Sequence, residues 1–253
     1  MDFRLDGKVA IVTGGASGIG RGISEAFGLA GACVLLTYYL SEQGAAETVA
    51  EIEKAGGMAH AMHADLTQES ENDRVMQTAV ERFGRLDILV TNSGGLLRRS
   101  RVTECPLELW NKALAINLTS TFLSCRAALK HMERAGSGCI ITTSSLAAHD
   151  GGGNGATHYA AAKAGVLTFT KALAKEVGPL GIRVNSVAPG LIGTQFHDRF
   201  STLEGRQTTV SRTPLGREGT PADVAAAVLF LASPASGFIT GEAIEVNGGQ
   251  GVF

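Results

Sequence analysis

The sequence predicts one α/β domain, built on a seven-stranded, mostly parallel sheet that is doubly wound with helices on both faces. Short apolar runs alternate with longer amphipathic segments along the chain, which is the order expected for parallel strands joined by crossover helices. Several of the apolar runs are continuous, as in strands that helices cover on both sides. A chain of 253 residues can bury one sizeable core, so we expect a single domain over residues 1–253.

Seven apolar runs have the length and composition of strands. In chain order they are Lys8–Thr13, Cys33–Tyr38, Met58–His63, Leu86–Thr91, Gly138–Thr142, Arg183–Ala188 and Ala243–Val246. Helical patterns lie between them at Gly18–Ala30, Gln43–Ala55, Ser70–Phe83, Leu107–Met132, His158–Val177 and Pro221–Ala232. The polar and weakly periodic segment 191–218 departs from this alternation, and we expect it to form a mobile flap over the site.

Charge and hydropathy argue against several classes of protein. The net charge of −2 gives no basic field that would draw the chain to nucleic acid or anionic lipid. The longest apolar run, Val224–Ala232, is too short to cross a bilayer, and the first six residues lack the apolar core of a secretion signal. The four cysteines are scattered without a C-x-x-C pair, which is typical of free thiols in a reducing compartment. We therefore expect a cytoplasmic protein with no metal, nucleic-acid or membrane partner.

A glycine-rich turn follows the first predicted strand. Gly14, Gly18 and Gly20 come after the apolar run Val9–Val12, and a predicted helix leads on from Ile19. Such a turn lets a pyrophosphate approach free backbone N–H groups and the positive end of the helix dipole. The G-x3-G-x-G spacing departs from the G-x-G-x-x-G form, and a plain tight turn is the alternative interpretation.

Two further segments are predicted to border this turn. Asp65, at the end of the third strand, is placed to hydrogen-bond an adenine amino group, although helix capping ahead of Gln68 would also explain it. Asn92–Gly95 ends the fourth strand, where small residues would let a cofactor lie close to the backbone. A turn alone would explain this segment too, so both interpretations stay open.

Six motifs then follow one another in a specific order. They are Thr13–Gly20, Asn92–Gly95, Asn117, Ser145, Tyr159 with Lys163, and Pro189–Gly190. This order resembles the short-chain dehydrogenase/reductase family, in which T-G-x3-G-x-G, N-N-A-G, Asn, Ser, Y-x-x-x-K and P-G occur in the same sequence. The resemblance covers nearly the whole chain. It implies a Rossmann-like fold and hydride transfer with a nicotinamide dinucleotide.

The chain departs from the family pattern in two places. Asn92–Gly95 reads N-S-G-G in place of N-N-A-G, and Ser145 lies one residue further from Tyr159 than the pattern has it. The second departure predicts an extra residue in the loop Ala147–Gly155, which would border the substrate pocket.

Tyr159 is the predicted acid and base of the reaction. A carbonyl that accepts hydride needs a proton at its oxygen, so the tyrosine pKa of about 10 is expected to fall toward neutrality. Lys163 lies one helical turn further along the same face, and its ammonium is predicted to lower that pKa. Ser145 is predicted to donate a hydrogen bond to the substrate oxygen. By the resemblance, Asn117 would hold a water that links Lys163 to solvent. For Y-x-x-x-K alone, a surface pair is the alternative.

The resemblance also implies a set of cofactor contacts. They are Gly14, Ser17, Gly18, Ile19, Gly20, Tyr38, Asp65, Leu66, Asn92, Ser93, Gly94, Tyr159, Lys163, Pro189, Gly190, Ile192 and Thr194. Tyr38 stands where an acidic residue would bind the ribose hydroxyls and repel a 2′-phosphate. No arginine stands at Ser17 or Tyr39 to bind that phosphate, but Thr37 and Ser41 could hydrogen-bond it. We expect NADP(H) to be slightly favoured over NAD(H).

The loop and the flap indicate the substrate. The glycine-rich loop His149–Gly155, with Gln195, His197 and Asp198, suits a sugar, a polyol or another small substrate such as a ketone. A 3-oxoacyl-[acyl-carrier-protein] reductase is the alternative within the family, although Leu180 stands where such enzymes tend to have a basic residue. A nicotinamide-binding regulator without catalysis is the alternative of another class, and the intact catalytic set argues against it.

Other residues near the predicted site carry weaker signals. His149 and His158 could touch a polar substrate, although loop histidines without a specific role are commoner. A basic group after the cofactor segment is more typical of a solvated surface than of an anion clamp: Arg98, Arg99 and Arg101. The resemblance implies a homotetramer, built on the long helices and the segment Gly241–Phe253.

Overall fold

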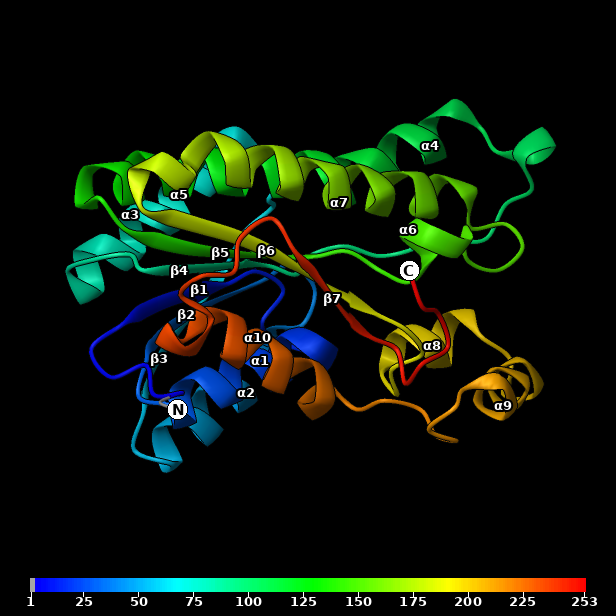
Figure 1. Ribbon diagram of the computed structural model, residues 1–253, viewed down its shortest axis with the longest axis horizontal. Helices are drawn as coiled ribbons and strands as arrows, with labels where there is room; N and C mark the ends of the chain where they lie inside the picture. The colour runs from blue at the N-terminus through cyan, green and yellow to red at the C-terminus, as the bar shows by residue number, and fades with distance from the viewer. Residues whose placement is uncertain (1–2) are drawn as a thin grey trace.

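A seven-stranded sheet runs through the centre of the computed structural model, which describes residues 3–253 (Figure 1). Its strands are β1 (Val9–Val12), β2 (Cys33–Tyr38), β3 (Met58–His63), β4 (Ile88–Thr91), β5 (Gly138–Thr143), β6 (Ile182–Pro189) and β7 (Ala243–Val246). Their spatial order is β3-β2-β1-β4-β5-β6-β7, and each neighbouring pair runs parallel. The predicted fold class is confirmed, and the sheet is parallel throughout its described strands.

Helices cover both faces of this sheet (Figure 1). On one face lie α1 (Gly18–Leu29), α2 (Glu42–Lys54) and α10 (Pro221–Ala232). On the other face lie α3 (Glu69–Phe83), α5 (Ser120–Ala135) and α7 (Thr157–Val177). Four more helices are α4 (Leu107–Leu114), α6 (Ala147–Asp150), α8 (Gln195–Phe200) and α9 (Leu203–Arg212). Across residues 3–253, no helix combines the length and apolarity that a membrane crossing needs.

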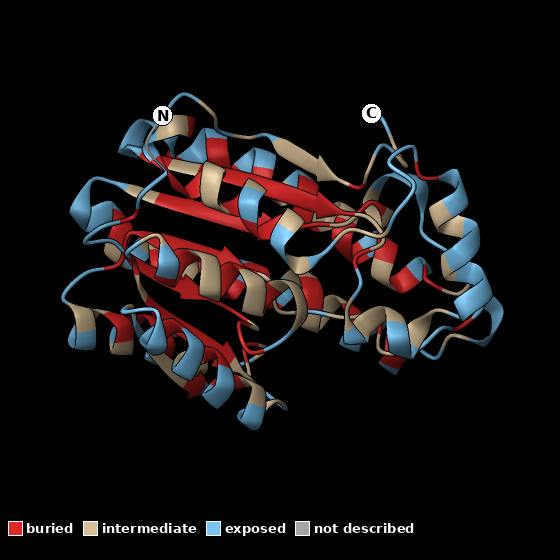
Figure 2. Ribbon diagram, turned by 90° about the horizontal axis from the view of Figure 1, so that it is seen from below, coloured by how far each residue is buried: buried red, intermediate tan, exposed pale blue. Residues whose placement is uncertain are grey.

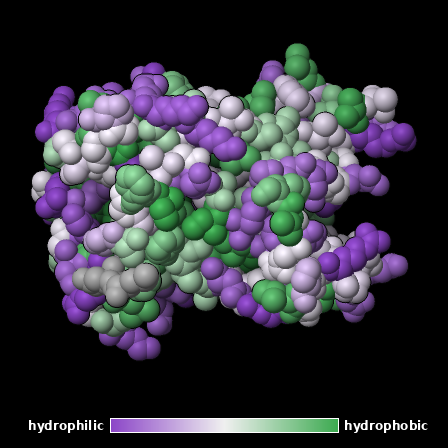
Figure 3. Space-filling view, in the orientation of Figure 1, coloured by the Kyte–Doolittle hydropathy of each residue, from purple (hydrophilic) through white to green (hydrophobic). Residues whose placement is uncertain are grey.

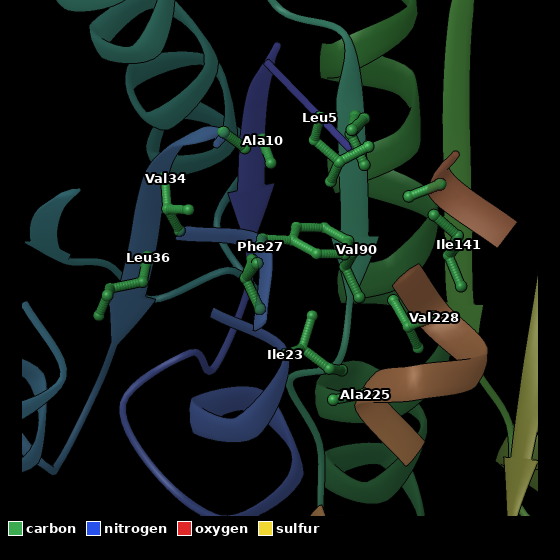
Figure 4. Packing of buried hydrophobic residues seen from close by; sticks show 14 of the residues in the cluster. Leu5, Ala10, Ile23, Phe27, Val34, Leu36, Val90, Ile141, Ala225 and Val228 are labelled. Atoms are coloured by element: carbon green, nitrogen blue, oxygen red, sulfur yellow. The ribbon is translucent and has the colours of Figure 1, made fainter. Parts of the chain in front are cut away.

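Two hydrophobic clusters fill the space between the sheet and its helical layers. Successive strand residues point to opposite faces, so Val12 joins the cluster beneath α1 and α10, and Ile11 joins the cluster beneath α3, α5 and α7. Phe27 lies fully buried in the first cluster (Figure 4), and the central strands are buried along most of their length (Figure 2). Burial of each such large side chain contributes about 1.5–3 kcal/mol. Coverage on both faces explains why these strands are continuous apolar runs.

The helix expected over residues 107–132 is interrupted. A π-helical segment, Ala115–Thr119, separates α4 from α5. Within it Asn117 is buried, and its Nδ2 donates to the carbonyl oxygens of Gly95 and Ala113, each at 2.9 Å. Single widened turns of this kind often occur at functional sites. Here the widened turn faces the segment that follows β4.

The segment 191–218, expected as a flap, contains the helices α8 and α9. Thr202 caps α9, since its hydroxyl oxygen accepts a hydrogen bond from the Gly205 N–H at 3.1 Å. Every residue of these two helices keeps some exposure to solvent. A helix that buries no full face carries little apolar periodicity, which is why the sequence did not reveal them. Mobility of the segment stays a prediction.

Candidate active site

The predicted site residues lie at one edge of the sheet. The strand order reverses between β1 and β4, and ligands of open α/β sheets bind beyond the carboxyl ends of strands at such a point. The glycine turn follows β1, Asn92–Gly95 follows β4, Ser145 follows β5, and Pro189 ends β6. The topology therefore brings together four segments that are far apart in the sequence.

The turn after β1 leaves room for a ligand but not for side chains. Gly14 and Gly18 have φ angles of +63° and +52°, which favour glycine. A Cβ at Gly20 would overlap the carbonyl of Gly14 and lie 2.6 Å from Nδ2 of Asn92. That Nδ2 itself donates to the carbonyl oxygen of Thr13 at 3.1 Å. The glycines thus keep an open cradle at the start of α1, and this cradle fits a pyrophosphate group.

The segment after β6 closes over the same turn. A Cβ at Gly18 would lie 3.4 Å from Cγ2 of Thr194, so Thr194 faces the glycine turn across a narrow gap. Ile192 is buried and pairs with Gly219 in a parallel bridge, which fixes the path of the chain beneath Thr194. Gly190 packs against Asn247, whose Cβ would lie 2.7 Å from a Cβ at that glycine. Thr194 therefore lies beside Gly18, and Asn92 lies beside Gly14 and Gly20.

The residues at the ends of β2 and β3 have local partners. Asp65 Oδ1 accepts hydrogen bonds from the N–H of Thr67 at 3.0 Å and from its hydroxyl at 2.7 Å, which closes a turn before α3. This supports a local capping role for Asp65, and an adenine contact stays a prediction. Leu66 is buried beside it. Tyr38 is half-buried and packs edge-on against His63, with ring centroids 5.6 Å apart.

Ser145, Tyr159 and Lys163 come together at the carboxyl end of β5. The side chains of Ser145 and Tyr159 are hydrogen-bonded to each other. Nζ of Lys163 lies 5.8 Å from the centre of the Tyr159 ring and donates to the carbonyl oxygen of Thr143 at 2.7 Å. Both Tyr159 and Lys163 project from α7 at i and i+4, which is why they share a face. Two hydroxyl groups and one ammonium therefore lie in one cluster.

The pKa values of this cluster differ from the expectation of a lowered phenol pKa. Burial raises the pKa of Tyr159, and the hydrogen bond from Ser145 offsets only part of that rise. Burial also lowers the pKa of Lys163 to about 8. Burial therefore dominates the pKa of the phenol in the protein without a ligand. In the protein alone, Tyr159 is a neutral proton donor at neutral pH.

Asn117 is hydrogen-bonded to the backbone of Gly95 beside the site. Its Oδ1 accepts a hydrogen bond from the Gly95 N–H at 3.0 Å, and its Nδ2 donates to the Gly95 carbonyl. A Cβ at Gly94 would overlap Oδ1 of Asn117 and lie 3.5 Å from Nζ of Lys163. Asn117 therefore lies close to Lys163 and holds the Gly94–Gly95 backbone in place. The water relay that the resemblance implies stays a prediction.

Phe196 of α8 is a site residue that the sequence interpretation missed. Its ring lies 6.0 Å from the ring of Tyr159 and 5.1 Å from that of Phe200. The signal that could have found it is its place two residues after Thr194, a predicted cofactor contact. The aromatic pair forms an apolar wall beside the phenol.

The basic group after β4 divides into two kinds of residue. Arg98 and Arg101 are exposed, as expected for a solvated surface. Arg99 instead donates from Nε to the carbonyl oxygen of Phe200 at 3.1 Å and from a terminal nitrogen to that of Asn154 at 2.8 Å. It thereby joins the end of α8 to the loop between α6 and α7.

The two histidines flanking the site are both engaged by the protein. His149 stacks on Phe253, with ring centroids 4.2 Å apart, and its Nε2 lies 3.1 Å from Oε1 of Glu245. His158 is buried, and its Nε2 lies 3.0 Å from the carbonyl oxygen of Leu96. These contacts support structural roles for both.

Known proteins resemble this chain along nearly its whole length. Residues 14–250 match the family model described as "Enoyl-(Acyl carrier protein) reductase". A 3-oxoacyl-[acyl-carrier-protein] reductase of Synechocystis is 38% identical over 250 residues, which cover 98% of this chain and 99% of the relative. A 3beta-hydroxysteroid dehydrogenase 1 of Eggerthella lenta is 39% identical over 251 residues, covering 98% of this chain and 95% of that protein.

Solved structures also resemble this fold. A 7alpha-hydroxysteroid dehydrogenase, complexed with NADH and 7-oxo glycochenodeoxycholic acid, superposes with a TM-score of 0.94 at 36% identity. The match covers 98% of this chain and 96% of that one. The chain is therefore an NAD(P)-dependent oxidoreductase, and it belongs to the short-chain dehydrogenase/reductase family.

Proposed function

We propose that this chain interconverts a carbonyl and a secondary alcohol on a small substrate, with Tyr159 as the acid and base. The observation that carries the proposal is the hydrogen-bonded pair of Ser145 and Tyr159 with Lys163 Nζ 5.8 Å from the phenol ring. We take residues 1–253 as one catalytic domain, with 191–218 as its flap. A regulator without catalysis is unsupported, because the named relatives are enzymes.

Each residue of the cluster has a distinct task. The bound nicotinamide dinucleotide, held by the glycine cradle, supplies or accepts the hydride. The hydroxyl of Ser145 donates to the substrate oxygen and stabilises the charge that develops there. Tyr159 gives that oxygen its proton during reduction and removes it during oxidation. Lys163 lies close enough to stabilise the phenolate left behind.

Replacement of Tyr159 by Phe tests the proposal. It removes the hydroxyl and keeps the ring that packs on Phe196, so kcat should fall by roughly a hundredfold to ten-thousandfold. The dissociation constant of the reduced cofactor, measured by fluorescence titration, should change little. A variant that retains turnover would refute the assignment of Tyr159.

We propose NADP(H) as the preferred cofactor. Thr37 is buried, and its hydroxyl accepts a hydrogen bond from the Gly14 N–H at 3.2 Å, so it faces the glycine turn and not an open groove. Ser41, the residue before α2, remains as a hydroxyl donor for a 2′-phosphate. Tyr38 ends β2 where an acidic residue would repel that phosphate. A measured preference for NAD(H) would contradict the proposal.

A small ketone is the substrate that the geometry supports best among the sugars, polyols and ketones considered. The rings of Phe196 and Phe200 offer an apolar surface beside Tyr159, against which the hydrocarbon part of a ketone can pack. A 3-oxoacyl thioester is the second candidate, because several relatives are named 3-oxoacyl-[acyl-carrier-protein] reductases. A substrate panel separates these classes. Ketones and a 3-oxoacyl thioester are tested with NADH and NADPH, and sugars and polyols with NAD and NADP. Turnover confined to sugars and polyols would exclude the ketone.

We also propose self-association into a homotetramer. Hydrophobic residues gather over α10 and β7 on the face seen in Figure 3, where Phe230 and Ile244 are only partly buried. The neighbouring Phe238 is fully exposed, and Phe122 on α5 packs edge-on against Phe169 of α7 while remaining exposed. Apolar surface on two sides of one protomer suits two separate contacts. Light scattering of the purified protein would reveal a monomer if this is wrong.

A further inference from the structure

A groove continues outward from the glycine cradle. It has a volume of about 530 Å³ and lies between the start of α1, the start of α2 and the segment after β6. Ser17 and Gly18 of the cradle line it, together with Thr194. Ser41, which follows β2 in the chain, also lines it. A dinucleotide in the cradle would therefore direct its ribose toward this groove.

The start of α2, which forms one side of the groove, packs closely against the glycine turn. A Cβ at Gly44 would overlap the hydroxyl of Ser41 and lie 2.5 Å from the carbonyl oxygen of Ala16. The start of α2 and the glycine turn are thus in direct contact, and Gly44 is needed for that contact. A group bound beside Ser41 would lie next to the first turn of α1.

Arg21 is the cation of this groove. It lies in the first turn of α1, which Ser17 precedes, and both side chains line the groove. Within residues 3–253, it is the single lysine or arginine among the residues that line the groove. The carboxylates of Glu25 and Glu47 line the same groove, so Arg21 is the group in it that can attract an anion.

Arg21 forms ion pairs with two carboxylates in this structure. Its Nε donates to Oε1 of Glu25 at 2.7 Å, and a terminal nitrogen donates to Oε2 of Glu47 at 3.0 Å. The Glu47 carboxylate also accepts from Nε2 of Gln43 at 3.0 Å. The side chain of Glu47 is about half exposed, and exposed ion pairs of this kind are weak. A doubly charged phosphate can therefore displace Glu47 from the guanidinium.

We propose that Arg21 selects the cofactor by exchanging Glu47 for the 2′-phosphate of NADP(H). Glu25 keeps the guanidinium positioned on α1 during the exchange, and Glu47 competes with the phosphate. The proposal rests on the proposed function only in that the cradle binds a nicotinamide dinucleotide. It assigns the discrimination between NADP(H) and NAD(H) to one exchangeable ion pair.

Binding measurements on Arg21→Gln test the exchange without turnover. The probes are NADPH and NADH by fluorescence, and 2′,5′-ADP and 5′-AMP by calorimetry, since the members of each pair differ by the 2′-phosphate. We expect Arg21→Gln to raise the dissociation constants of NADPH and 2′,5′-ADP about tenfold, while those of NADH and 5′-AMP change less than about twofold. Equal weakening of both members of a pair would overturn the proposal, as would no change in either.

A second variant tests the competition. Glu47→Gln should tighten NADPH and 2′,5′-ADP about threefold or more, because the guanidinium is released from one carboxylate. The same change should have no effect when Arg21→Gln is also present. Tightening that persists without Arg21 would show that Glu47 acts through general charge and would overturn the exchange.

Arg74→Gln is the matched control. Arg74 on α3 pairs with Glu71 at 2.6 Å and donates to the carbonyl oxygen of His63 at 2.7 Å, and none of these three residues lines the groove. Its binding constants should equal those of the wild type, and a loss of NADPH affinity like that of Arg21→Gln would overturn the proposal. Failure of the unmodified protein to bind either NADPH or NADH would refute the proposed function itself. If Arg21→Gln leaves the dissociation constants of both NADH and NADPH unchanged, only this inference is refuted.

Discussion

Lys163 and Arg21 are two cations that differ in burial and in their partners. Lys163 is 4% exposed and donates to the backbone carbonyl of Thr143, and burial lowers its pKa to about 8. Arg21 is about a third exposed and is bonded by the carboxylates of Glu25 and Glu47. A buried cation without a carboxylate partner costs stability but acts strongly on a neighbouring phenolate. An exposed and paired cation costs little and can exchange its partners.

Of the two cations, Lys163 is expected to give the larger effect when it is replaced, as in Lys163→Met. The change should lower kcat by roughly a hundredfold or more, because the phenolate of Tyr159 loses its cation. It should also raise the free energy of unfolding at pH 7 by ~1–2 kcal/mol, since removing the buried charge outweighs the lost bond to Thr143. Urea titration and steady-state kinetics measure the two effects. If Lys163→Met lowers the free energy of unfolding at pH 7, the buried charge does not destabilise the fold.

The pH dependence of that stability difference sharpens the same comparison. The pKa of Lys163 is 10.5 in the unfolded chain and about 8 in the fold, so between these values the unfolded state binds more protons. The contribution of Lys163 to stability is therefore least favourable below pH 8 and improves as the pH rises toward 10.5, by about 3 kcal/mol in total.

Urea titrations of wild type and Lys163→Met at pH 7, 8.5 and 10 check this sign. The advantage of the methionine variant should shrink with rising pH and disappear near pH 10. An advantage that is constant across these pH values would contradict the lowered pKa.

The smallest effect is expected for the stability of Arg21→Gln. The ion pairs of Arg21 with Glu25 and Glu47 are partly exposed, so their loss should change the free energy of unfolding by less than about 1 kcal/mol. Thermal unfolding without cofactor measures this. A loss of several kcal/mol would make Arg21 a structural link between α1 and α2 instead of a site residue.

Much of the fold could be predicted because its signals are local. The run Val9–Val12 is buried on both faces, and the glycines after it are needed wherever backbone approaches backbone, as at Gly20. Tyr159 and Lys163 share a face because four residues make about one turn of helix. These features follow from neighbours in the chain, so the sequence alone was enough to find them.

The flap could be predicted only in outline. Phe196 contacts Tyr159 from a helix that begins 36 residues further along the chain, and no periodicity connects the two. Asn117 was predicted as a site residue, but its π-helical turn depends on the Gly95 backbone, which comes from another strand end. Contacts across the sheet edge therefore set the shape of the pocket.

The sequence by itself determined a doubly wound α/β fold and a Tyr–Lys pair on one helix, because strand burial and helical spacing are written in short stretches of chain. Only the tertiary structure decided the charge states and partners of the site. Whether Lys163 is buried, whether Arg21 is exchangeable and whether Phe196 covers the phenol all depend on which distant segments meet, and the dielectric around a charge is set by those segments.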